Sequence, residues 1–146
     1  MSETPIARPT AIHHVRLTVT DIHRSKAFYQ LLLGPETAFD FSDRVDEPGV
    51  TEDPSQLYGG AGFTIGDQLL GLRPVASSGD TFDSTRVGLD HLSLQVGSED
   101  ELREAAARLD EAGVEHGEVT TLEETGMVIL SVQDPDDINI ELVHMP

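Results

Sequence analysis

The sequence predicts an α+β fold made from two copies of one unit, in which a strand and a helix are followed by three further strands. A shift of 77 residues places His14 on His91 and Leu17 on Leu94. In each copy an alternating strand pattern leads through a polar turn to a helical pattern, and then to a glycine. Self-similarity of this length indicates an internal repeat of a supersecondary unit.

The first strand of each copy alternates between apolar and polar residues, which is the period of a strand with two unlike faces. The apolar face is expected to pack on the following helix. In the first copy Val15, Leu17 and Val19 oppose His14, Arg16 and Thr18; in the second, Leu92, Leu94 and Val96 oppose His91, Ser93 and Gln95.

The two helices carry recognisable end signals. Asp21 is a predicted N-cap, and Ser98 with Glu101 fits a capping box. Gly34 and Gly113 suit C-terminal caps. The apolar positions expected to be buried are Ile22, Ala27, Phe28, Leu31 and Leu32 in the first helix, and Leu102, Ala105, Ala106 and Leu109 in the second.

Three more strands are predicted after each helix, at about 37–41, 61–66 and 68–73 and at about 117–121, 127–132 and 138–143. The Asp-, Glu-, Pro- and Gly-rich run from Ser42 to Gly60 is predicted to be a long loop. Residues 74–83 read as a linker. We therefore expect one domain over residues 1–146, with one module at about 11–75 and another at about 87–146.

Composition excludes several classes of function. Acidic residues outnumber basic ones by 27 to 9, giving a formal net charge of −18, so we expect no nucleic-acid or membrane partner, since both are bound through Lys and Arg. The chain has no cysteine, which excludes disulfides and thiolate-bound zinc. With neither a signal-peptide pattern nor an apolar run of roughly 18 residues, a cytoplasmic protein is expected.

Three residues have the pattern of a metal site. His14 and His91 occupy equivalent positions on the polar faces of the repeated strands, and packing gives no reason for imidazole at both. Glu141 lies between apolar residues in an alternating strand, where its desolvation needs solvent or a cation to offset it. Structural histidines and an exposed edge strand are the alternatives. Two imidazoles and a carboxylate form a facial triad with open positions, which suits Fe²⁺, Mn²⁺, Ni²⁺, Co²⁺ or Zn²⁺.

At these residues the sequence resembles the vicinal oxygen chelate superfamily, which includes glyoxalase I, fosfomycin-resistance proteins, methylmalonyl-CoA epimerase and extradiol dioxygenases. The resemblance covers about residues 12–144. It implies paired βαβββ modules that form a curved mixed sheet around a metal cleft, often in a homodimer. The matching residues are His14-Val15, Val19, Asp21, Phe28-Tyr29, Leu33-Gly34, His91, Asp134-Pro135-Asp136 and Glu141-Leu142.

The resemblance implies four ligand positions, one on the first and last strand of each module. His14, His91 and Glu141 fill three of them, and the fourth falls on Gly71, which cannot ligate. This is similar to the three-ligand members of the superfamily, the dioxygenases and fosfomycin-modifying enzymes. The last motif departs from the family pattern, since Asp137 and Ile138 stand where Gly and Asn or His are usual.

Residues near these positions are candidates for contact with a small-molecule substrate. Arg16, Arg73 and Ser93 lie on the polar faces of their strands. Tyr58 and His116 are candidate acid–base groups, and Glu141 is a further candidate catalytic residue. Each has an alternative as a solvated strand residue, a loop-packing residue or a surface histidine. His13, His23 and His144 are interpreted as structural or exposed.

The leading functional hypothesis is a metal-dependent dioxygenase, or a related lyase or isomerase, acting on a bidentate oxygen ligand. Because no Lys or Arg follows Arg108, the sequence favours a neutral or monoanionic substrate over fosfomycin or glutathione. The alternative is a non-catalytic drug- or metabolite-binding resistance protein of the same fold. The bleomycin-resistance relatives generally lack the metal triad, so its residues favour the enzyme.

Overall fold

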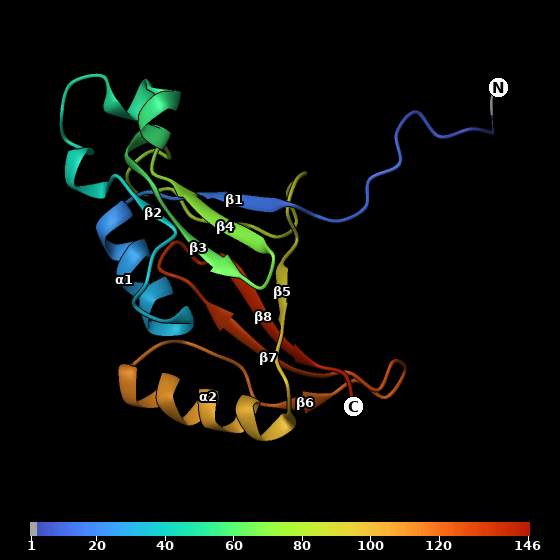
Figure 1. Cartoon of the computed structure of the whole chain (residues 1–146). Coiled ribbons are helices and arrows are strands. Elements are labelled where there is room, and N and C mark those ends of the chain that lie inside the picture. Colours follow the sequence, from blue (N-terminus) through green and yellow to red (C-terminus); the bar gives the residue numbers. More distant parts are fainter. Residues whose placement is uncertain (1–2) are drawn as a thin grey trace. The chain divides into compact units, whose positions relative to one another are not determined.

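The computed structural model describes residues 3–146 and divides into two compact units, one ending at Ser78 and the other beginning at Gly79. These units are called the first and second modules below. Each contains a four-stranded mixed sheet and one α-helix (Figure 1). The predicted α+β class and the two βαβββ units are therefore confirmed. Among the described residues, no helix is long and apolar enough to cross a membrane.

The first module consists of β1 (His14–Thr18), α1 (Ile22–Leu33), β2 (Phe39–Asp40), β3 (Ala61–Ile65) and β4 (Gln68–Arg73), and its strand order is β1-β4-β3-β2. Strand β1 runs parallel to β4, whereas β3 is antiparallel to both of its neighbours. Alternate residues of these strands point into the core, as the period of two predicts. The buried residues include Leu17, Ala61, Phe63, Leu70 and Leu72.

Helix α1 begins at the predicted cap, because the Asp21 carboxylate accepts hydrogen bonds from the backbone amides of His23 (2.9 Å) and Arg24 (3.2 Å). It ends before Gly34, whose φ of 109° favours glycine. The buried stripe differs from the predicted one. Ala27 and Leu31 are exposed because the core-facing residues recur at i, i+3 and i+7 from the first turn. These buried residues are Ile22, Ser25, Phe28 and Tyr29.

The second module consists of β5 (Leu92–Gln95), α2 (Glu99–Ala112), β6 (Thr120–Thr121), β7 (Val128–Gln133) and β8 (Asn139–His144), ordered β5-β8-β7-β6. Its pairing repeats the first module, with β5 parallel to β8. Strands β2 and β6 are shorter than predicted. Just before the second of these predicted strands, an isolated bridge joins His116 to Val132.

Helix α2 also has the predicted ends. The Ser98 hydroxyl accepts from the Glu101 amide at 3.2 Å, and Gly113 caps the C-terminus in the left-handed conformation with φ of 70°. Leu102 and Leu109 are buried. The predicted stripe is therefore correct at its large residues, while the alanines between them are only half-buried.

The long loop of the first module is folded into three 3-10 turns, η1 (Ser42–Arg44), η2 (Val50–Glu52) and η3 (Pro54–Gly59). The Asp53 carboxylate caps the last of these by accepting from the Ser55 amide at 2.9 Å. Leu57 and Tyr58 have φ of 46° and 59°, a left-handed conformation that is uncommon for side chains of this size. The loop is therefore held in a specific and strained shape.

A turn built on Asp134 leads into β8. Its buried carboxylate accepts from the amides of Asp136 and Ile138, both at 2.8 Å. Asp137 has φ of 66°, which explains why glycine is usual there in the family pattern, and Asp is among the residues that tolerate this conformation. The turn keeps the spacing to Glu141.

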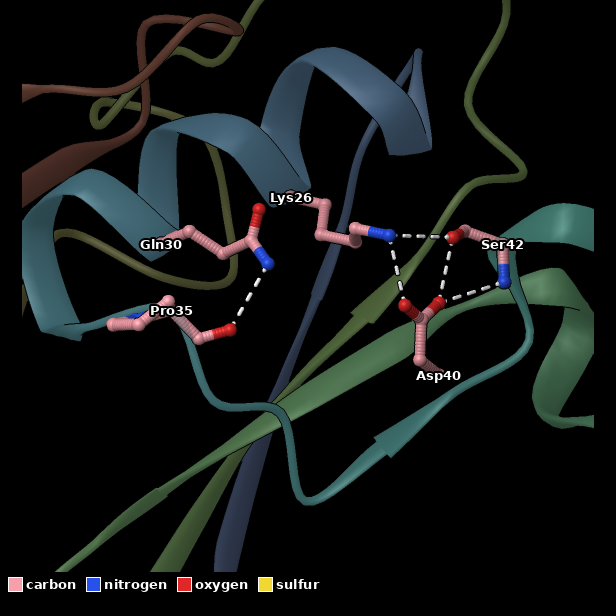
Figure 2. A network of polar contacts seen from close by, with 5 residues as sticks. All are labelled: Lys26, Gln30, Pro35, Asp40 and Ser42. Atoms are coloured by element: carbon pink, nitrogen blue, oxygen red, sulfur yellow. Dashed lines mark hydrogen bonds and ion pairs between the residues drawn. The ribbon is translucent and has the colours of Figure 1, made fainter.

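A polar network ties α1 to the strand that follows it (Figure 2). The Lys26 ammonium lies 2.7 Å from the Asp40 carboxylate and donates to the Ser42 hydroxyl at 3.0 Å. Ser42 in turn donates to Asp40 through its hydroxyl (2.6 Å) and its amide (2.9 Å). Burial alone would raise the pKa of Asp40, but the hydrogen bonds from Lys26 and Ser42 outweigh it and lower that pKa.

Asp40→Asn is expected to reduce the free energy of unfolding at neutral pH by about 1 kcal/mol. The reason is that the substitution removes the carboxylate charge that strengthens its three hydrogen bonds. A lowered pKa means that the stabilisation is complete above the ordinary value of 3.8 and is lost as the pH falls through the folded-state value. Urea unfolding from about pH 5 to about pH 2 should therefore show the difference from wild type shrinking. Asp43→Asn, an exposed neighbour, is the matched control, and an equal effect of both variants would contradict the assignment.

Candidate functional site

Two of the predicted metal ligands lie together in the second module. Residue His91 immediately precedes β5, and Glu141 is on the parallel strand β8, where it pairs with Ser93. The His91 Nε2 atom is 3.8 Å from the Glu141 Oε2 atom. Two ligand atoms bound to one divalent ion are about 3.0–3.4 Å apart at tetrahedral or octahedral angles. A small side-chain movement would therefore let both atoms ligate the same ion.

Both of these side chains are oriented by a further polar group. The His91 Nδ1 lies 2.6 Å from the Asp90 carboxylate. Since an ionised carboxylate only accepts, the neutral imidazole carries its proton on Nδ1 and has its lone pair on Nε2. The Ser93 hydroxyl donates to Glu141 Oε1 at 2.8 Å. Metal-bound histidines and carboxylates are typically supported in this way.

The third predicted ligand lies in the first module. His14 is the first residue of β1, and its Nδ1 atom is 2.9 Å from the Nδ1 atom of His13. One ring donates and the other accepts, and the Nε2 atom of His14 takes no part in this contact. The repeat places His13 on Asp90, so each predicted histidine ligand has a polar partner for Nδ1 just before it in the chain.

Strand register identifies Gly71 as the counterpart of Glu141. In the first module Arg16 pairs with Gly71, and in the second Ser93 pairs with Glu141. Arg16 and Ser93 are equivalent under the repeat, so the residues opposite them are equivalent as well. The end of the first module thus offers a glycine where the second offers a carboxylate, as the family resemblance implied.

Within residues 3–146, no group of three His, Cys, Asp or Glu side chains lies at metal-binding distance. His91 and Glu141 form a pair in one module, and His14 belongs to the other.

The predicted substrate residue Arg16 and the predicted acid–base residue Tyr58 meet in the first module. Tyr58, in η3, lies under the guanidinium of Arg73 at 3.7 Å from the ring centroid and near that of Arg16 at 5.8 Å. Arg16 and Arg73 are on β1 and β4 and share one face of the sheet with His14 and Gly71. Cation–π attraction therefore joins the loop to this face.

The other histidines have separate surroundings. Both ring nitrogens of His116 are hydrogen bonded, Nε2 to the Asp110 carboxylate and Nδ1 to the Gly117 carbonyl, each at 2.6 Å. The bond to Asp110, with help from Gly117, raises the pKa of His116. His116 thus fastens the end of α2 to the following segment. His144 Nδ1 is 3.4 Å from a backbone carbonyl, and His23 is exposed on α1.

Sequence reasoning did not assign the polar partners of the ligands. Asp90 was passed over, and His13 was interpreted only as structural or exposed. The repeat could have identified them, because it aligns His13 with Asp90. Each of these side chains can hydrogen bond to the imidazole of the next residue.

A protein-family model described as the Glyoxalase/Bleomycin resistance protein/Dioxygenase superfamily matches residues 11–142. A glyoxylase/bleomycin resistance protein/dioxygenase domain from Frankia sp. EAN1pec is 27% identical, with a TM-score of 0.73 over 95% of this chain and 100% of that one. The comparison with curated proteins gave no match.

Two further solved structures share the fold at lower identity. Lactoylglutathione lyase from Agrobacterium tumefaciens is 20% identical, with a TM-score of 0.65 over 94% of this chain and 95% of that one. A variant of the fosfomycin resistance protein FosX from Listeria monocytogenes, complexed with Mn(II) and 1S,2S-dihydroxypropylphosphonic acid, is 18% identical, with a TM-score of 0.69 over 95% of both chains.

Asp110→Asn is expected to lower the pKa of His116 toward its ordinary value of 6.5, because the largest cause of the upward shift is removed. A raised pKa stabilises the fold fully below 6.5, and that stabilisation is lost as the pH rises through the folded-state value. The variant should therefore be destabilised more at about pH 6 than at about pH 9. NMR titration of His116 measures the shift. Glu111→Gln is the control, and an unchanged titration in Asp110→Asn would contradict the assignment.

Proposed function

Because the chain belongs to the glyoxalase/bleomycin resistance protein/dioxygenase superfamily, we propose that it is a divalent-metal-dependent enzyme whose ligands are His14, His91 and Glu141. The observation that carries the proposal is the arrangement in the second module. There His91 Nε2 faces Glu141 Oε2 at 3.8 Å, and both side chains are held by hydrogen bonds that leave these atoms available.

The donor set fits a catalytic divalent ion. Two imidazole nitrogens and a carboxylate oxygen suit borderline and hard metals, among them Mn²⁺, Fe²⁺, Co²⁺, Ni²⁺ and Zn²⁺. Each module supplies at most two of the ligands, so the proposed site requires both. When bound, the metal would act as a Lewis acid on an oxygen ligand. The FosX structure with Mn(II) and a dihydroxy phosphonate supports a site of this kind on this fold.

The glycine at position 71 supports a three-ligand site with open positions for substrate. Such positions suit a ligand that chelates through two oxygen atoms, and the proposed chemistry is that of a dioxygenase or a related lyase or isomerase. Ser93 is proposed to hold Glu141 in its ligating orientation by donating to Oε1. The acid–base roles of Tyr58 and His116 and the homodimer stay predictions.

Substitution of each proposed ligand tests the site. His14→Ala, His91→Ala and Glu141→Ala are each expected to lose most of the bound metal while the circular dichroism spectrum is retained, because two remaining ligands hold a divalent ion weakly. Elemental analysis of the purified proteins measures this, with exposed His23→Ala as control. Stoichiometric metal in all three variants would exclude the proposed ligands. A metal-free wild type that binds small molecules would favour the drug- or metabolite-binding alternative.

Asp90→Asn is a finer test, because it keeps all three ligands. Loss of the charge behind His91 is expected to weaken metal affinity about 10- to 100-fold without abolishing binding. Competition with a chelator measures the change. Asp100 is an exposed acidic residue on α2, so Asp100→Asn controls for the loss of one negative charge. An equal change in both variants would show that Asp90 acts only through the electrostatic potential of the whole protein.

A further inference from the structure

The first module gathers two arginines around one aromatic ring. The Arg73 guanidinium is stacked 3.7 Å from the Tyr58 centroid, and the Arg16 guanidinium lies at 5.8 Å. Tyr58 is brought there by the left-handed backbone at Leu57 and Tyr58. Strain of this kind in a loop is kept where the surrounding structure requires it, often at ligand sites.

These two cations have no acidic partner in the described part of the first module, residues 3–78, although acidic residues outnumber basic ones threefold in the chain. Among the residues that the structure describes, the buried Arg73 Nε has no hydrogen-bond acceptor. By contrast, Lys26 of the same module is paired with Asp40. Two neighbouring guanidinium groups repel one another, and a buried donor without an acceptor costs free energy. An anion bound beside Arg16 would offset the repulsion between the two guanidinium groups.

A hollow of about 230 Å³ opens beside Arg16. Arg16 also covers the position that lacks a ligand, since a β-carbon built on Gly71 would lie 3.6 Å from Arg16 Cγ and 3.7 Å from its Nε. The remaining walls are mostly apolar. The residues that line the hollow are His13, His14, Arg16, Phe39, Leu57, Leu69 and Gly71.

The two modules thus use equivalent positions differently. In the second, the short Ser93 supports the carboxylate of Glu141. In the first, the long Arg16 extends over Gly71 and places a positive charge where the other module has a negative one. With glycine at position 71, the first module has no carboxylate to act as a fourth ligand. Arg16 instead offers a cationic partner to a carboxylate that belongs to a bound small molecule.

We propose that the hollow binds the carboxylate of an organic acid through Arg16. Arg73 does not line the hollow but adds a second positive charge nearby, and Tyr58 is the positioning residue for both arginines. The planar carboxylate matches the fork of a guanidinium, and the apolar walls suit a small aromatic or aliphatic body. This inference rests on the proposed function in one respect, namely that the acid is the substrate whose oxygen atoms reach the metal. It makes the substrate a monoanionic, carboxylate-bearing chelator.

The arginine site is tested first in metal-free protein, with benzoate as the probe and neutral benzamide as its matched control. Benzoate at millimolar concentration should shift the Nε–H NMR signals of Arg16 and Arg73, while that of Arg103, which is paired with Glu99, stays in place. Arg16→Gln should weaken benzoate binding about tenfold or more, and Arg103→Gln should not. Equal responses to benzoate and benzamide, or tighter binding of inorganic phosphate than of benzoate, would overturn the carboxylate assignment.

The link to the metal is tested in the metal-loaded protein by comparing 3,4-dihydroxybenzoate with catechol. Wild type should prefer the carboxylated ligand about tenfold, equivalent to about 1.4 kcal/mol. Arg16→Gln should lose that preference while it keeps its metal and its affinity for catechol, and Tyr58→Leu should reduce the preference in the same way. A wild type that binds metal but shows no preference overturns this inference alone. If the protein binds no metal but benzoate still shifts the arginine signals, the metal proposal fails and the carboxylate site stands.

Discussion

The parallel pairing of the first and last strand in each module is the constraint on which the site depends. Parallel strands cannot be joined by a tight turn, so the chain between them forms a helix and two antiparallel strands. The pairing is what brings Glu141 beside Ser93 and His91, which are far from it in the sequence. It also fixes which side chains share the polar face, because residues that pair across neighbouring strands point to the same side.

The same register supports two different chemistries. Ser93 and Glu141 form a carboxylate with its hydrogen-bond donor, whereas the equivalent Arg16 and Gly71 form a cation beside a position without a side chain. The backbone is common to both, so the difference depends on side-chain length and charge alone. A duplicated unit can therefore place a carboxylate at one position and a cation beside its counterpart without any change in strand pairing.

Local patterns in the sequence were sufficient for the order of the strands and for the helix caps, because each depends on a short period or on the repeat. The equivalence of Gly71 with Glu141 came from the family resemblance, and strand register confirms it. The prediction of the buried face of α1 was partly wrong. Ser25 is buried in place of Ala27, and this is decided by the direction in which the helix packs. The stacking of Tyr58 on the arginines could not be predicted, because it requires left-handed conformations at two residues that are not glycine. The pairing of His116 with Asp110 likewise depends on how the chain turns after α2.

The strong negative charge of the chain gives the local arginines their importance. A net charge of −18 attracts divalent cations and repels organic anions at long range. This repulsion is screened over about 8 Å at physiological salt, whereas a guanidinium acts on a carboxylate at hydrogen-bond distance. Binding of an anionic ligand is therefore favoured where cations stand close together without acidic partners, as Arg16 and Arg73 do among residues 3–78 of the first module. The overall negative charge and the arginine pair are thus complementary, because the first would favour uptake of the proposed metal and the second would favour the proposed carboxylate ligand.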